Sequence, residues 1–249
     1  EAVIKALSRA CPRRAMAGWG RRFRIAISGE DPRTGRPFIW HMFQARPGGG
    51  ASSAGDGWPT VGEWQAAGGI KFGSLEVTEV RFPLFFRRHE FRPGSGGDGQ
   101  YRGGPGASME LLVEIARPAQ ANTAGDGVRH GACGLFGGAD GLPHRYVLRS
   151  KGRPDRVLKT KEVGIPIHPG DVIHVESGGG GGWGPPPPPR PAARALDLEN
   201  GFVTDDGSRR GPGKSGRRAP AKRKRAEAQS DGGAQGRSSA ALPPGRKKN

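Results

Sequence analysis

Glycine runs at the ends of predicted strands constrain this chain more than any other feature. The longest run, Gly178–Gly182, follows an apolar strand and precedes the proline run Pro185–Pro189. Similar glycine clusters occupy residues 94–106 and 131–138. Glycine has no Cβ, so its backbone amides can approach a ligand closely and can form an anion-binding concavity. A flexible linker is the alternative, but a linker would not follow a strand so abruptly, and we therefore expect ordered loops.

The strands are short and are bounded by glycine, proline or aspartate, which is typical of an antiparallel sandwich or barrel core. Short helices are predicted at Glu1–Arg9 and Ala192–Asn200. The predicted fold class is α+β and β-rich, with short antiparallel strands, long glycine-rich loops, few helices and a disordered C-terminal tail. The predicted strands are Phe23–Ser28, Pro37–Ala45, Leu75–Val80, Leu84–Phe91, Ser108–Ala116, Arg145–Ser150, Arg156–Thr160 and Asp171–Val175.

The positive charge of the chain is concentrated at its C-terminal end. The formal net charge is +17, and residues 207–249 carry 13 Lys and Arg against two Asp and Glu. That segment has hardly any apolar residues, so it cannot bury enough surface to order itself. We predict two regions, a folded region at 1–206 and a disordered basic tail at 207–249.

The two cysteines, Cys11 and Cys133, form no disulfide framework, so a reducing compartment is expected. No apolar run approaches the roughly 18–20 residues that a membrane span needs, and no membrane partner is predicted. The predicted location is cytoplasmic.

Isolated reactive side chains give weak signals. Cys133 lies three residues after His130, which could serve as its base, but a small residue in a packed turn is the favoured interpretation. Glu76 and Glu79 are three apart on a predicted strand and would face opposite sides, so they are not expected to act as a pair. The six histidines show no ligand spacing, and no metal site is predicted.

Several segments in order resemble the C-terminal part of the hydantoinase B/5-oxoprolinase family, which includes N-methylhydantoinase subunits and relatives in acetone and acetophenone carboxylases. These segments are GGIKFGSLEVTEVRFPLFFRRHEFRPGSGGDGQYRGGPG (68–106), GLFGGADGLPHRYVL (134–148), TKEVGIPIHPGDVIHVESGGGGGWG (160–184) and RALDLENGFVT (194–204). The resemblance covers residues 1–206, which we expect to be the C-terminal part of a longer subunit.

The resemblance implies a subunit of an ATP-dependent hydrolase that opens a cyclic amide such as 5-oxoproline, which would connect it to glutathione metabolism, or N-methylhydantoin. It also implies an A-type partner subunit, or a fused domain, that holds ATP with Mg. The fragment by itself is expected to be inactive without the upstream half and that partner.

The same resemblance suggests which residues stabilise negative charge at a lactam carbonyl oxygen. The predicted catalytic residues are Arg92, Ser95 and Arg102. The predicted substrate-binding or anion-binding residues are Gly96, Gly97, Gly103, Gly104, Gly178, Gly179, Gly180, Gly181 and Gly182.

Two positions depart from the family pattern, because Gly94 and Pro185 stand where the family commonly has Asp. Any charge role at these two positions is therefore not expected here.

An alternative function is a β-scaffold that binds nucleic acid or another polyanion through the basic stretch Arg217–Arg225. Residues 207–249 contain no aromatic side chain that could stack on bases. Nucleic acid is therefore not the favoured partner.

Overall fold

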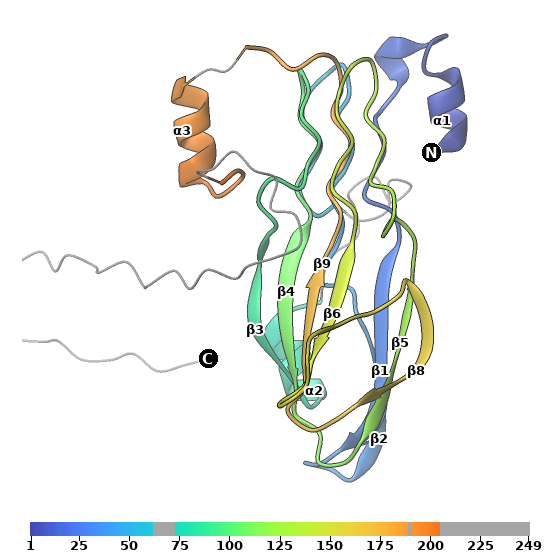
Figure 1. Cartoon of the computed structure of the whole chain (residues 1–249), viewed down its shortest axis with the longest axis vertical. Coiled ribbons are helices and arrows are strands. Elements are labelled where there is room, and N and C mark those ends of the chain that lie inside the picture. The colour runs from blue at the N-terminus through green and yellow to red at the C-terminus, as the bar shows by residue number, and fades with distance from the viewer. Residues whose placement is uncertain (62–72, 189–190, 205–249) are drawn as a thin grey trace, which may run out of the picture. The chain divides into compact units, whose positions relative to one another are not determined.

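The computed structural model describes residues 1–61, 73–188 and 191–204. Two antiparallel sheets form the framework, one with the strand order β2-β1-β5-β8 and the other with β3-β4-β9-β6-β7 (Figure 1). The first sheet contains β1 (Phe23–Asp31), β2 (Arg36–His41), β5 (Ala119–Gly125) and β8 (Lys161–Ile167). The second contains β3 (Leu84–Phe91), β4 (Ala107–Val113), β6 (Arg145–Arg149), β7 (Arg156–Val157) and β9 (Val172–Glu176).

The two sheets enclose one hydrophobic core. Alternate side chains of β1 and β4 are buried, as a strand with one face inward requires, and the buried residues of both sheets form a single contact cluster. Ile25 and Ile27 contribute from one sheet, and Met109 and Leu111 from the other, all with no exposed surface. The β-rich antiparallel fold class predicted from the sequence is therefore confirmed.

The predicted hairpin is confirmed, because β1 and β2 pair with Ile27 opposite Trp40. Four other predicted strands correspond to β3, β4, β6 and β9, and a fifth is present only as the two-residue β7. Strands β5 and β8 were missed. The sequence of β5, AQANTAG, is rich in Ala and Gly, which have low strand propensity, and in β8, KEVGIPI, a glycine and a proline interrupt the β-branched residues. Burial of alternate residues within the sandwich outweighs that propensity.

The predicted strand Leu75–Val80 is wrong, because this segment forms helix α2 (Leu75–Arg81). Ser74 caps the helix by accepting a hydrogen bond from the Val77 backbone N–H at 3.2 Å. Pro83 disfavours helical geometry at the preceding residue, Phe82, so the helix does not continue. Glu79 consequently lies on a helix, and its side chain accepts a hydrogen bond from the Phe86 N–H at 2.8 Å.

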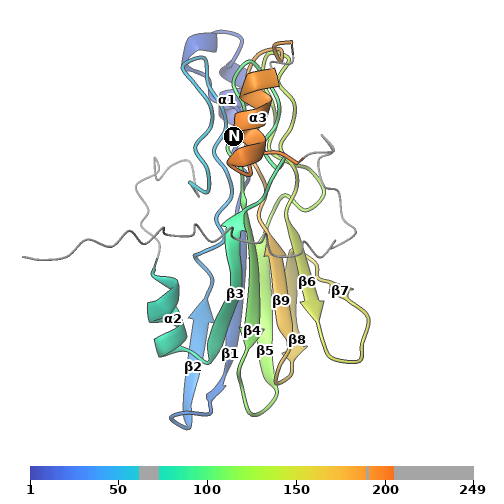
Figure 2. The same ribbon diagram turned by 90° about the vertical axis from the view of Figure 1, so that its left-hand side faces the viewer.

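The other helices lie at the glycine-rich end of the sandwich (Figure 2). They are α1 (Ala2–Leu7), a 3-10 turn at Pro12–Arg14 and α3 (Pro191–Glu199), in agreement with the predicted terminal helices. Residues 207–249 lie outside the described residues, so the disordered tail and the boundary at residue 206 stay predictions.

Candidate functional site

Five segments with few regular elements run side by side from the ends of the strands, between α1 and α3 (Figures 1 and 2). Backbone hydrogen bonds join every one of them to at least one other. We call this assembly the glycine bundle, and it comprises residues 17–20, 48–51, 95–106, 131–142 and 178–183. The bundle brings together the three glycine clusters that the sequence places far apart.

The central segment of the glycine bundle repeats every three residues. The consecutive residues Gly180, Gly181 and Gly182 form backbone hydrogen bonds with different neighbouring segments. Trp183 then pairs with Tyr101, which belongs to the same segment that Gly180 contacts. A β-strand repeats every two residues, whereas polyproline II geometry repeats every three. The hydrogen bonds are Gly180 N–H to Gly104 O (2.9 Å), Gly97 N–H to Gly180 O (2.8 Å), Gly181 N–H to Gly18 O (2.7 Å), Ala51 N–H to Gly181 O (2.9 Å), Gly182 N–H to Ala139 O (2.9 Å) and Leu135 N–H to Gly182 O (2.9 Å).

Only glycine fits at the centre of this bundle. A Cβ on Gly180 would lie 1.8 Å from the Gly49 carbonyl oxygen, and one on Gly103 would lie 1.9 Å from the Gly180 oxygen. The obstructing atoms are backbone, which cannot rotate away as a side chain can. The same restriction places glycine on the crowded axis of collagen. The long glycine run is therefore an ordered structural element, as we expected, and not a linker.

The amides of the predicted anion-binding glycines are mostly occupied. Seven of the nine donate to an acceptor in the chain: six to backbone carbonyls and Gly178 to the ring nitrogen Nδ1 of His144. Of these nine glycines, Gly96 and Gly179 are the two whose backbone N–H groups have no hydrogen-bond acceptor among the described residues. Anion binding by these glycines stays a prediction, and the contacts found here give seven of them a structural role.

Arg92 and Ser95 are buried where β3 enters the glycine bundle. The Arg92 guanidinium donates to the carbonyl oxygens of Pro143 at 2.7 Å and Ser177 at 3.1 Å. Burial lowers the pKa of Arg92 below its ordinary value, while Glu176 opposes that shift. The Ser95 hydroxyl donates to the Arg92 carbonyl at 2.7 Å and accepts from the Gly106 N–H at 2.9 Å. Both side chains hold loops together here, and their catalytic roles stay predictions.

Arg102 joins the glycine bundle to the C-terminal helix. Its guanidinium makes two hydrogen bonds to the Asp197 carboxylate of α3, at 2.6 and 3.0 Å. Its backbone N–H donates to Asp56 at 2.8 Å. This two-pronged geometry is the strongest form of an arginine–carboxylate pair. Neither Asp197 nor Asp56 could be identified as a partner from the sequence, because neither lies near Arg102 along the chain.

His144 is a buried group that sequence reasoning did not single out. Its ring stacks on Phe23 with centroids 4.4 Å apart, and its Nδ1 accepts the Gly178 N–H at 2.6 Å. Burial lowers the pKa of His144 to about 3, and the charge of Arg92 acts in the same direction. The ring is therefore neutral at physiological pH and serves as an acceptor that anchors the start of the glycine run.

Charged side chains cover the outer face of the second sheet. His174 lies between Glu110, whose Oε1 is 3.4 Å from Nδ1, and Glu176, whose Oε1 is 3.6 Å from Nε2. Burial alone would raise the pKa of Glu176, but the hydrogen bond with His174 and the charge of Arg92 lower it to about 2. No group of three or more His, Cys, Asp or Glu among the described residues is arranged to hold a metal ion.

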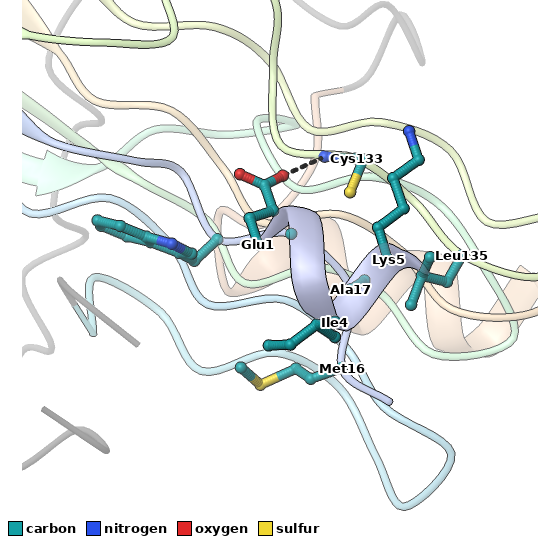
Figure 3. A pocket seen from close by; sticks show the side chains of 9 residues that line it. Glu1, Ile4, Lys5, Met16, Ala17, Cys133 and Leu135 are labelled. Carbon is teal, nitrogen blue, oxygen red and sulfur yellow. Dashed lines mark hydrogen bonds between the residues drawn. The ribbon is translucent and has the colours of Figure 1, made fainter. Parts of the chain in front are cut away.

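Cys133 lies in a small pocket between α1 and the glycine bundle (Figure 3). Its backbone N–H donates to the Glu1 carboxylate at 3.4 Å, and its carbonyl accepts from the Gly18 N–H at 2.7 Å. Burial raises the pKa of the thiol, which disfavours the thiolate that a nucleophile needs. Among the described residues that line the pocket there is no histidine. These contacts support the predicted packing role.

Comparison with known proteins matches residues 1–186 to the Hydantoinase B/oxoprolinase family. The chain belongs to this family. The resemblance inferred from the glycine motifs is therefore confirmed. None of the helices in the described residues is long and apolar enough to cross a membrane.

Two relatives of this hydantoinase B-family chain differ in how much of the chain they match. It is 34% identical over 221 residues to caprolactamase subunit beta of Pseudomonas jessenii, covering 84% of this chain and 37% of the relative. It is 29% identical over 132 residues to 5-oxoprolinase 1 of Arabidopsis thaliana, covering 53% of this chain and 10% of the relative. The chain therefore spans little more than a third of the first relative and a tenth of the second.

Two solved structures share the fold of this chain. The crystal structure of ATP-dependent caprolactamase from Pseudomonas jessenii superposes with a TM-score of 0.71 at 29% identity, covering 82% of this chain and 36% of that chain. A nucleotide-free acetone carboxylase structure gives a TM-score of 0.61 at 21% identity, covering 77% of this chain and 29% of that chain. The second likeness concerns the fold alone.

Proposed function

We propose that this chain is the C-terminal part of a subunit of an ATP-dependent cyclic-amide hydrolase that opens a lactam or hydantoin ring. The observation that carries the proposal is the 34% identity to caprolactamase subunit beta across 84% of the chain. The family assignment and the likeness to the caprolactamase structure support it further. 5-Oxoproline is a second candidate substrate, because a named 5-oxoprolinase is also a relative.

The proposed reaction needs ATP because an unstrained amide carbonyl is a poor electrophile. Transfer of the γ-phosphoryl group to the carbonyl oxygen, with release of ADP, makes the ring carbon more electrophilic. Water then adds to that carbon, and the ring C–N bond breaks as the nitrogen takes up a proton. The acyl phosphate that remains is hydrolysed by a second water to a carboxylate and inorganic phosphate. The negative charge that develops on oxygen requires positioned donors.

We assign the nucleotide and its Mg²⁺ to a partner subunit of the A type. The arginines of the glycine motifs are poor candidates for phosphate binding in this part, because Arg92 and Arg102 are both engaged by other groups of the chain. The name "subunit beta" of the first relative is consistent with a second kind of subunit. No nucleotide step is therefore assigned to residues of this chain.

In this proposal the glycine bundle is a rigid support for the part of the subunit that contacts the substrate. Its hydrogen bonds fix the loop that carries Arg92, Ser95 and Arg102, and they leave little freedom for rearrangement. Of the nine predicted glycines, Gly96 and Gly179 are the two whose amides have no acceptor in the described residues, and we propose them as donors to developing negative charge.

The test is to purify the full-length protein that contains this chain together with its ATP-binding partner, and to supply caprolactam and 5-oxoproline separately. Amino acid formation coupled one-to-one to ADP is expected for at least one of them. Reactions without ATP or without the partner are the controls and are expected to give no product. Ring opening in the absence of ATP, or failure of the complex to open any lactam or hydantoin, would contradict the proposal.

A further inference from the structure

A basic cleft of about 450 Å³ lies outside the glycine bundle, where the end of β5 and the start of β8 meet the residues that precede β1. Its volume lies within the range of small-molecule sites. Four cationic side chains line it, from Arg21, Arg129, Lys159 and Lys161. Asp126 is the acidic residue among the described lining residues, so the cleft carries an excess of positive charge.

Two of these cations have no partner among the residues that the structure describes. In the described residues neither the Arg129 side chain nor the Lys159 side chain makes a hydrogen bond or an ion pair. Lys161 lies 3.4 Å from Asp126, but both side chains are mostly exposed, so this pair is weak. Arg129 and Lys159 are therefore available to an anion.

The backbone of the cleft is strained at one cationic position. Arg21 has φ of 69°, a conformation that residues other than glycine rarely adopt. On the facing loop, Gly127 has φ of 74°, and a Cβ there would lie 3.3 Å from the Arg21 Cδ. Such strain persists where the surrounding structure enforces it, and it is concentrated at functional sites. The fold thus holds Arg21 against this loop at an energetic cost. The Arg21 guanidinium is itself paired with the Glu1 carboxylate at 3.1 Å, so the anion-binding role falls chiefly to Arg129 and Lys159.

From these observations we propose that the cleft binds a small phosphorylated molecule. A ligand with several phosphate oxygens can accept from more than one cation at once, and the arginine fork suits those oxygens in particular. Among the described lining residues, Val128 is the one large apolar side chain that could hold an uncharged ligand. The concave shape and limited volume favour a small molecule over an extended nucleic acid. This proposal does not depend on the proposed lactam hydrolysis.

The test measures binding of inorganic pyrophosphate to the full chain by isothermal titration calorimetry at fixed ionic strength. Saturable binding at one site is expected for the natural sequence. The double variant Arg129→Glu/Lys159→Glu is expected to bind about tenfold or more weakly, since each charge-assisted hydrogen bond contributes strongly. The matched control Lys151→Glu/Arg153→Glu changes the net charge equally on an exposed turn outside the cleft.

Three results would overturn the proposal. They are absence of saturable pyrophosphate binding, an equal loss of affinity in the cleft variant and the control, and retention of full affinity in the cleft variant. None of these measurements requires turnover, so their failure is distinguishable from failure of the proposed hydrolase function.

Discussion

Replacing Gly180 with alanine tests whether the glycine bundle is a packed structural element. The added Cβ would lie 1.8 Å from the Gly49 oxygen and 2.3 Å from its carbonyl carbon. Ordinary contacts of a Cβ lie near 3.4–4 Å, so one of the two segments must move by more than an ångström. Gly180 and Gly49 each take part in two backbone hydrogen bonds to other segments.

The expected cost follows from those hydrogen bonds. Separation of the segments would break at least two of them inside a buried region, and a buried polar group left without a partner costs about 1–3 kcal/mol. We expect Gly180→Ala to lower the free energy of unfolding by about 3–5 kcal/mol, a large part of the roughly 5–15 kcal/mol typical of a domain. The melting temperature should fall by about 6–20 °C for a chain of this size.

Urea denaturation followed by tryptophan fluorescence and circular dichroism measures this change. The matched control is Gly55→Ala, because a Cβ on Gly55 meets no atom within 4 Å and its φ is not in the left-handed range. That variant is expected to lie within about 1 kcal/mol of the natural sequence, and it can be slightly more stable.

A Gly180→Ala protein that unfolds within 1 kcal/mol of the Gly55→Ala control would refute the reasoning. It would mean that the segments of the glycine bundle can separate without loss of stability, and that the glycine run is not needed for close packing.

Two further predictions concern single side chains. His144 binds a proton only below about pH 3 when folded, whereas an unfolded histidine binds one below about 6.5. Because the unfolded state binds more protons between these values, stability should fall as the pH is lowered, by about 2 kcal/mol from pH 7 to pH 5. His144→Gln should remove this contribution, and equal pH profiles would contradict it. Asp197→Asn should lower the free energy of unfolding by about 1 kcal/mol at low salt, because it weakens the ion pair with Arg102. Urea unfolding measures this change, with Glu199→Gln on the same helix as a control that should have no such effect. Equal effects of the two variants would contradict the prediction.

Much of the framework could be predicted from residue patterns. Alternation of apolar residues in β1 and β4 indicates one buried face, and the turn residues between β1 and β2 indicate a hairpin. The glycine motifs also indicated the family correctly. These signals are local or depend on the order of motifs along the chain, so they can be read without knowledge of the fold.

Helix α2 and strand β5 were not predicted because tertiary contacts outweigh their local propensities, whereas in β8 (KEVGIPI) a glycine and a proline interrupt an alternation of β-branched residues. The β-branched residues of Leu75–Arg81 favour a strand, yet the Ser74 cap and the packing of Thr78 against Gln44 hold a helix. In β5 the small residues Ala119 and Ala121 are buried within the sandwich although their propensity for strands is low.

The sequence by itself determined that ordered, glycine-rich loops adjoin an antiparallel β-sandwich. Only the tertiary structure decided what the glycines do. A sequence does not show whether a glycine N–H is available to a ligand or already donates a hydrogen bond to a carbonyl of a distant segment. The same holds for Arg92 and Arg102, whose partners Pro143, Ser177 and Asp197 lie between 51 and 95 residues away. Spacing along the chain does not predict such pairs, because the two groups come within hydrogen-bond distance only when the backbone has folded.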